Sequence, residues 1–135
     1  MTSHLRRRLE SADHGVLSTL HPERGVDAVP VCFAIDGDLV GIPIDLVKAK
    51  RSTNLGRLRN LEQDPRATLL VEQWDRDDWS QLWWVRASLE RKPPDPAAHE
   101  RFVRLLEQKY PQYAEGSIES VILLTIVDLV GWSAT

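Results

Sequence analysis

The stretch that decides the fold covers residues 26–44 and reads VDAVPVCFAIDGDLVGIPI. Its first part, residues 26–35, is rich in β-branched side chains and predicts a strand. Asp36-Gly37 is a strong signal for a tight hairpin turn, and residues 39–44 supply the returning strand. We therefore expect an antiparallel hairpin at the centre of the chain.

Working outward from this hairpin, helices and strands alternate along the rest of the chain. A short helix over residues 2–12 and a strand over residues 16–20 precede it. A helix that Ser52 or Thr53 caps follows it and ends at Asp64-Pro65. The remaining predicted elements are strands over residues 67–74 and 82–89, a helix over residues 96–109 capped by Asp95, and a strand over residues 121–130.

This order predicts a mainly β fold. Strands outnumber helices, and a tight turn joins two of them, which favours an antiparallel barrel with attached helices over a doubly wound parallel sheet. The 135 residues match the length of one domain, so we expect residues 1–135 to form a single domain.

Two of the predicted strands are apolar on both faces. Trp83 and Trp84 are consecutive and must point to opposite sides of their strand, and residues 121–130 show no alternation of apolar and polar side chains. One face fills the barrel, so the other needs a cover. A second copy of the chain is the expected cover, and the helix over residues 96–109 is the alternative.

Basic residues gather around the start of the helix that follows the hairpin. Lys48, Lys50 and Arg51 lie just before the expected N-terminus of this helix, and Arg57 lies about one turn inside it. On a helical path Lys50, Asn54 and Arg57 share one face. Cations at a helix N-terminus oppose the helix dipole unless an anion lies among them. The segment therefore predicts a phosphate site, although a solvated charged surface would have the same spacing.

Composition narrows the functional classes. The net charge of -3 gives no reason to expect a nucleic-acid partner. A single cysteine, Cys32, excludes an intrachain disulfide and favours a reducing cytoplasm. We find neither a secretory signal nor an apolar run of membrane-spanning length. The four histidines show no metal-binding spacing, so no metal site is predicted.

Six motifs occur in a fixed order along the chain from Gly15 onward, and together they resemble the pyridoxamine 5′-phosphate oxidase-like, FMN-binding split-barrel family. Their order is most similar to the actinobacterial subgroup that uses the deazaflavin coenzyme F420. The motifs are Lys-Ala-Lys-Arg from Lys48, Leu-Arg-Asn-Leu from Leu58, Asp-Pro-Arg-Ala from Asp64, Asp-Asp-Trp-Ser-Gln-Leu-Trp-Trp-Val-Arg-Ala from Asp77, Lys-Tyr-Pro-Gln-Tyr from Lys109, and Gly131-Trp132.

The resemblance implies a split-barrel homodimer with its cofactor at the subunit interface. It implies that Arg57 binds the phosphate, with Lys50 and Arg51 as an additional basic pair. The strand residues that it places along the cofactor ring are Pro30, Val31, Cys32, Ile42, Pro43 and Ile44. The residues that it brings from the other subunit are Trp79, Leu82 and Trp83.

The function expected from this resemblance is hydride transfer between reduced coenzyme F420 and a small organic substrate. The additional cations Lys48, Lys50 and Arg51 suit the long anionic tail of coenzyme F420 better than the single phosphate of FMN requires. An FMN-binding oxidoreductase remains open, as does a non-catalytic carrier of a flavin, deazaflavin or tetrapyrrole. A structural dimer with an empty cleft is a fourth possibility. In this chemistry the cofactor carries out the redox step, and the sequence offers no side chain as a nucleophile or general base.

Overall fold

The fold is described from a computed structural model, which defines residues 3–45, 51–113 and 115–135. Side chains are defined for residues 4–44, 56–113 and 115–135. The helices are α1 (Ser3–Ser11), α2 (Arg51–Gln63) and α3 (Pro96–Lys109), with a short 3-10 helix η1 (Trp79–Gln81). The strands are β1 (Gly15–His21), β2 (Gly25–Val31), β3 (Ala34–Asp36), β4 (Leu39–Asp45), β5 (Arg66–Gln73), β6 (Trp83–Arg91) and β7 (Ile118–Ser133).

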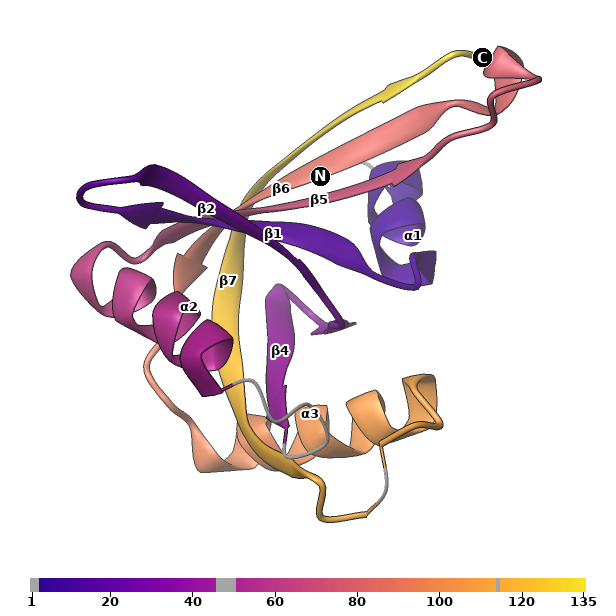
Figure 1. The fold of residues 1–135 in the computed structure, drawn as a ribbon. Helices are drawn as coiled ribbons and strands as arrows, with labels where there is room; N and C mark the ends of the chain where they lie inside the picture. The colour runs from indigo at the N-terminus through magenta and orange to yellow at the C-terminus, as the bar shows by residue number, and fades with distance from the viewer. Residues whose placement is uncertain (1–2, 46–50, 114) are drawn as a thin grey trace.

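All seven strands belong to one antiparallel sheet, in the order β2-β1-β5-β6-β7-β4-β3 (Figure 1). This confirms the prediction of a mainly β, antiparallel fold with attached helices. The prediction of helix 96–109 with Asp95 as its cap is also confirmed, because the Asp95 carboxylate accepts hydrogen bonds from the N–H groups of Ala97 and Ala98. Proline at the first helical position and a capping aspartate fix this helix start locally.

Two local predictions were wrong. Residues 26–35 form two strands, because β2 ends at Val31 and β3 begins at Ala34. The chain between them, Cys32 and Phe33, leaves one edge of the sheet and enters the other. Helix α2 begins at Arg51, so Ser52 and Thr53 lie inside its first turn rather than at the cap. Four strands therefore precede α2, instead of the three that the sequence predicts.

Two apolar clusters hold the domain together. The first fills the inner face of the curled sheet and includes Leu17, Leu69 and Leu124, with Leu5 and Leu9 of α1 against it. In the second, α3 packs through Phe102 and Leu106 onto β3, β4 and the first part of β7. Figure 1 shows α3 along the lower end of β4 and β7, while the far ends of β5, β6 and β7 project away from it.

The long strand β7 changes its register once. Leu89 pairs with Ile126 but Ser88 pairs with Asp128, which leaves Val127 as an extra residue in a β-bulge. The first part of β7 is covered on both sides, by the barrel and by α3. The alternative prediction, that the helix over residues 96–109 covers the second apolar face, is thus correct for the first part of β7 only. Further along the strand, Val127, Val130 and Trp132 remain exposed.

The strand register defines an exposed sheet surface, called the outer face below. Its first row crosses five strands and consists of Pro30, Val16, Leu70, Arg86 and Val130. A second row next to it consists of Ala28, Ser18, Thr68, Ser88 and Asp128. None of these side chains is buried. Trp84 also lies on this face, opposite Trp132 of β7, whereas Trp83 packs toward the inner cluster. The prediction that the two tryptophans point to opposite sides is confirmed.

Helices of membrane-spanning length and hydropathy do not occur among the residues that the structure defines.

The contact between α3 and β4 gives a first testable prediction. A Cβ atom on Gly41 would lie 2.4 Å from Cδ1 of the buried Phe102 ring, so the glycine permits the close approach of helix and strand. We expect Gly41→Ala to lower the free energy of unfolding by about 1–3 kcal/mol, as overpacking does in other cores. Urea denaturation followed by tryptophan fluorescence measures this change.

A matched control lies in α2, where nothing lies within 4 Å of a Cβ added to Gly56. Gly56→Ala should stabilise the protein by about 0.5–1 kcal/mol, because alanine favours the helix. Equal effects of the two substitutions would contradict the proposed steric difference.

Candidate functional site

Arg57 lies beside a hollow between α2 and the β1–β2 hairpin, called the Arg57 hollow below. The hollow has a volume of about 310 Å³. Its lining residues are Thr19, Arg24, Val26, Asp27, Ala28, Val29, Gly56 and Arg57. The Arg57 side chain is half-buried and its Nε atom is shielded from solvent. Gly56 beside it also lines the hollow, and a Cβ atom added there would meet nothing within 4 Å.

A buried polar network fixes α2 against the hairpin. Asn60 is only 3% exposed, and its amide nitrogen donates to Thr19 Oγ1 and to Asp27 Oδ2, both at 2.9 Å. Arg24 donates to both oxygens of the same Asp27 carboxylate, at 2.8 and 3.0 Å. The bonds from Arg24 and then from Asn60 hold the pKa of Asp27 well below its usual range. Asp27 therefore stays ionised as the shared acceptor between the helix and the hairpin.

The Asp-Pro-Arg motif forms a local turn between α2 and β5. Arg66 donates to Asp64 from its backbone N–H at 3.1 Å and from its guanidinium at 2.8 and 3.0 Å. The Arg66 guanidinium lowers the pKa of Asp64 to about 2. The motif therefore fixes where the helix ends and the next strand begins, and it contributes no group to the Arg57 hollow.

The six residues expected along the cofactor ring lie on β2, on β4 and at the junction after β2. On β2, Pro30 is exposed on the outer face, whereas Val31 is buried in the first cluster. Cys32 at the junction is half-buried and packs against the second cluster. On β4, Ile42 and Pro43 are buried and Ile44 is half-buried. Side chains of β4 are thus turned away from solvent, which leaves mainly backbone groups to meet a ligand.

Both of these strands have an edge without a strand partner in the part of the sheet that the structure defines. β2 is the first strand of the sheet and pairs with β1 only. β4 pairs with β3 only through Leu39, Val40 and Gly41, so Ile42 to Ile44 have a strand partner on the β7 side alone. A proline in each of these stretches, Pro30 and Pro43, suits such an edge because proline donates no ladder hydrogen bond. The barrel is therefore split between these two strands.

The remaining basic residues of the predicted phosphate site are only partly described. Lys48 and Lys50 lie outside the described residues. Arg51 and Asn54 belong to α2, but their side chains also lie outside the described set. The predicted shared face of Lys50, Asn54 and Arg57 thus stays a prediction.

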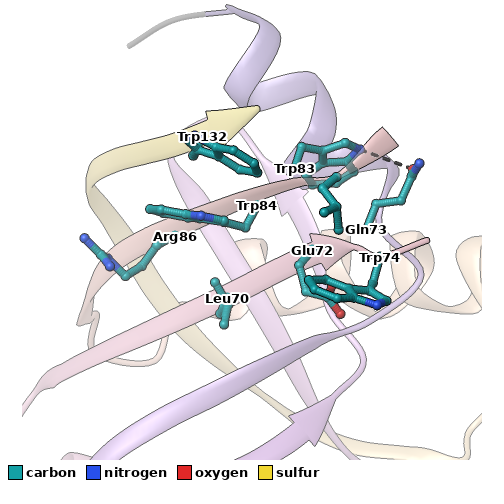
Figure 2. Close-up of a pocket in the computed structure, with 9 residues that line it drawn as sticks. Leu70, Glu72, Gln73, Trp74, Trp83, Trp84, Arg86 and Trp132 are labelled. Atoms are coloured by element: carbon teal, nitrogen blue, oxygen red, sulfur yellow. Dashed lines mark hydrogen bonds between the residues drawn. The ribbon is translucent and has the colours of Figure 1, made fainter. Parts of the chain in front are cut away.

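A second hollow, called the tryptophan hollow below, lies at the far end of the outer face and has a volume of about 730 Å³. Its lining residues are Leu70, Glu72, Gln73, Trp74, Leu82, Trp83, Trp84, Arg86 and Trp132. Figure 2 shows Trp84, Trp132 and Leu70 around it, with the Trp83 indole bonded to Gln73. Arg8 lies 5.3 Å over the Trp83 ring and Arg86 lies 5.3 Å over the Trp84 ring. Trp83 is thus held by two contacts, the hydrogen bond to Gln73 and the stacking of Arg8.

The three residues expected from the other subunit occur at this end. Leu82 is buried and Trp83 is half-buried, whereas Trp79 is 65% exposed and lies 6.2 Å from the Trp74 ring. Leu89 of β6 pairs with Ala67 of β5, and Ala67 pairs with Thr19 of β1, which lines the Arg57 hollow. Trp83 is six residues before Leu89 on β6, which corresponds to roughly 20 Å along the strand. One chain therefore does not bring the tryptophans and Arg57 together.

No group of three histidine, cysteine, aspartate or glutamate side chains that could hold a metal ion occurs in the described part of the chain. Sequence reasoning missed Asn60, although it lies in the Leu-Arg-Asn-Leu motif. An asparagine next to the apolar stripe of a helix was the available signal, since a buried amide needs hydrogen-bond partners on another element.

Comparison with known proteins identifies the fold. No protein-family profile and no curated protein matches the sequence. Among solved structures, an FMN-binding protein from Syntrophomonas wolfei is 15% identical with a TM-score of 0.68, covering 97% of this chain and 88% of that chain. An F420 reductase is 19% identical with a TM-score of 0.65, covering 93% of this chain and 94% of its own.

A third match is a candidate pyridoxamine 5′-phosphate oxidase from Corynebacterium glutamicum. It is 12% identical with a TM-score of 0.61, and the match covers 98% of this chain and 95% of that chain. The similarity extends over nearly the whole length of all three proteins. The chain therefore has the split-barrel fold that the sequence motifs led us to expect.

The Asn60 network gives the prediction of this subsection. Asn60→Leu keeps the size of the side chain but leaves the buried Thr19 hydroxyl and the Asp27 carboxylate without their amide donor. We expect a loss of about 1–3 kcal/mol in the free energy of unfolding, measured by urea denaturation.

Arg24→Gln is the matched control, because it removes only the solvent-exposed ion pair to the same carboxylate. It should change stability little. A larger loss in Arg24→Gln than in Asn60→Leu would show that the buried network does not hold α2.

Proposed function

We propose that the chain is an oxidoreductase that transfers hydride between reduced coenzyme F420 and a small organic substrate. The observation that carries the proposal is the half-buried Arg57 side chain beside an open hollow that is lined by residues of β2, the first strand of the sheet. The shared fold supports it, since solved proteins of this fold include one named as FMN-binding and one named as an F420 reductase.

Charge and space around Arg57 fit a phosphate. Arg24 also lines the hollow and donates to the Asp27 carboxylate. A phosphate at Arg57 would gain charge-assisted hydrogen bonds from the guanidinium, which are the stronger class in proteins. Small residues on either side, Gly56 and Ala28, leave room for its oxygens.

The ring of the cofactor would lie along the split. Ala28 and Val29 line the Arg57 hollow, and Pro30 to Cys32 follow directly on the same stretch of chain. A molecule with its phosphate at Arg57 would thus extend toward Pro30 and the open edge of β4. A flat, polar-edged ring matches this place, because the backbone of Ile42 to Ile44 has no strand partner on that side, where Pro43 offers a C=O acceptor but no N–H.

The choice of coenzyme F420 over FMN rests on the sequence. Lys48, Lys50 and Arg51 add three cations within ten residues of Arg57. One phosphate needs fewer cations, whereas the anionic tail of coenzyme F420 extends beyond its phosphate. The reduced deazaflavin would supply the hydride, while the chain binds and orients the cofactor and excludes water. FMN is the second candidate, favoured by the FMN-binding protein of the same fold.

A second copy of the chain would complete the site. The outer face exposes Leu70, Val130 and Trp132 on one sheet surface, which a second copy could cover. Packing two outer faces together would bury these side chains. The same packing would bring Trp79, Leu82 and Trp83 of one copy toward the Arg57 hollow of the other. We also place the protein in the reducing cytoplasm, because Cys32 is its only cysteine.

The phosphate contact is tested by titrating the protein with coenzyme F420 and, in parallel, with FMN. Arg57→Ala should weaken binding of the preferred cofactor by about 1.5–3 kcal/mol, because a hydrogen-bonded charge is lost. Arg59→Ala removes an exposed arginine of the same helix and should leave the affinity unchanged. Equal affinities of wild type and Arg57→Ala would remove Arg57 from the site, and a preference for FMN would select the second candidate.

The second copy is tested by sedimentation velocity. Leu70→Glu introduces a charge at the centre of the outer face and should convert a wild-type dimer into a monomer. Ala97→Glu on an exposed position of α3 is the control and should leave the oligomeric state unchanged. A wild-type protein that sediments as a monomer would contradict the proposed dimer.

A further inference from the structure

The motif Lys109-Tyr-Pro-Gln-Tyr has no part in the function proposed so far. Its first two residues contact Phe33, in the connection between β2 and β3. β2 and β3 are the two outermost strands of the sheet, and only Cys32 and Phe33 connect them. β2 and β3 do not pair with each other in the described sheet. The junction therefore depends on hydrogen bonds from outside the strand ladder.

Phe33 illustrates this dependence most clearly. Its side chain is 0% exposed, and its backbone groups take no part in a strand ladder. Tyr110 Oη accepts the Phe33 N–H at 3.1 Å, and Lys109 Nζ donates to the Phe33 carbonyl oxygen at 2.9 Å. The Tyr110 hydroxyl donates in turn to the carbonyl oxygen of Asp13 at 2.8 Å, just before β1. Two consecutive side chains thus satisfy both backbone groups of the junction residue.

A lysine at such a position loses part of the hydration of its ammonium group, which is energetically unfavourable. Its ammonium group is half-buried, and burial lowers the pKa of Lys109. The described residues include no carboxylate within ion-pair distance of it. It lies 4.0 Å from the centre of the Phe33 ring and 5.2 Å from that of Tyr110, at the C-terminus of α3. Aromatic faces and a helix C-terminus both favour a cation, which reduces the cost of burial.

The junction also continues directly into the proposed site. Pro30, Val31 and Cys32 precede Phe33, and Cys32 packs against the same cluster as Tyr110. Ala28 and Val29, a few residues earlier, line the Arg57 hollow. A shift of the Phe33 backbone would therefore move the wall along which the cofactor ring is proposed to lie.

We propose that Lys109 and Tyr110 are positioning residues that clasp the Phe33 backbone and thereby set the geometry of the Pro30–Cys32 wall for the cofactor ring. The clasp itself is independent of any ligand. Its effect on the ring rests on the function proposed above.

The clasp is tested without a ligand by amide hydrogen exchange, followed by NMR. Tyr110→Phe removes one oxygen atom and leaves the Phe33 N–H without its acceptor. Exchange at Phe33 should become about threefold to tenfold faster, while exchange at Leu69 in the central strand β5 stays unchanged. Unchanged exchange at Phe33 would overturn the clasp.

The effect on the ring is tested with two ligands, coenzyme F420 and the deazaflavin riboside that lacks the phosphate and the tail. Lys109→Met and Tyr110→Phe should weaken both ligands by the same factor, about threefold to thirtyfold. Lys109→Arg still donates to the Phe33 carbonyl and should restore most of the affinity. Lys92→Met, a second half-buried lysine away from the junction, is the control and should have no effect.

Comparison with Arg57→Ala separates the two proposals. Arg57→Ala should weaken binding of coenzyme F420 but leave binding of the riboside unaffected, whereas the clasp variants should weaken binding of both ligands. Riboside affinity that is unchanged in both clasp variants would overturn the positioning role. If wild-type protein binds neither ligand, the proposed function fails together with the positioning role, while amide exchange still decides the clasp.

Ionisation of Tyr110 provides an independent readout of the same contact. Burial raises the pKa of Tyr110 to about 12, since the phenolate would lose hydration beside Asp13 and Cys32. A raised pKa favours the neutral tyrosine in the folded state, so its contribution to stability is complete below pH 10 and is lost as the pH rises toward 12. The tyrosinate absorbance after a rapid pH jump should show a step near pH 12 that is missing from Tyr110→Phe. A Tyr110 step near pH 10, the ordinary value for tyrosine, would contradict the buried hydroxyl.

Discussion

Chain continuity between the two outermost strands is the constraint on which the rest of the structure depends. β2 and β3 occupy opposite edges of the sheet, yet only Cys32 and Phe33 separate them along the chain. The three Cα–Cα steps from Val31 to Ala34 span at most about 11 Å, so the sheet must curl until its edges approach each other. The curl encloses the first apolar cluster and turns Leu70, Arg86 and Val130 outward.

The same constraint creates the open part of the barrel. β3 is only three residues long, so it covers the edge of β4 as far as Gly41 and no further. From Ile42 onward the backbone of β4 faces the split, across which β2 presents its own free edge. A short strand thus determines where backbone groups are available, and the nearby Arg57 adds the charge. A non-catalytic carrier would use the same groups, so turnover with reduced cofactor distinguishes it from an enzyme.

The sequence predicted those features that local chemistry determines. Asp95 and Pro96 mark the start of α3, and Asp36-Gly37 marks the β3–β4 turn, because cap and turn residues act on their immediate neighbours. The break at Cys32-Phe33 was missed, since both residues also suit a strand. The roles of Asn60 and Tyr110 depend on partners 33 to 97 positions away along the chain, which periodicity cannot reveal. Of the predicted site, the position of Arg57 near β2 is described, while its relation to Lys50 and Asn54 is outside the described side chains.

The bulge at Val127 has a consequence for how this chain tolerates insertions and deletions. Before the bulge, β7 packs on α3 and the barrel, and after it the strand presents Val130 and Trp132 to the outer face. Leu89 pairs with Ile126 and Ser88 with Asp128, so removing the extra residue would leave an unbroken ladder in which every later residue keeps its partner. Trp132 would still lie opposite Trp84 on the outer face, and Leu129 opposite Ala87. Removing a paired residue further along would instead turn the later side chains to the opposite face, because side chains alternate with a period of two.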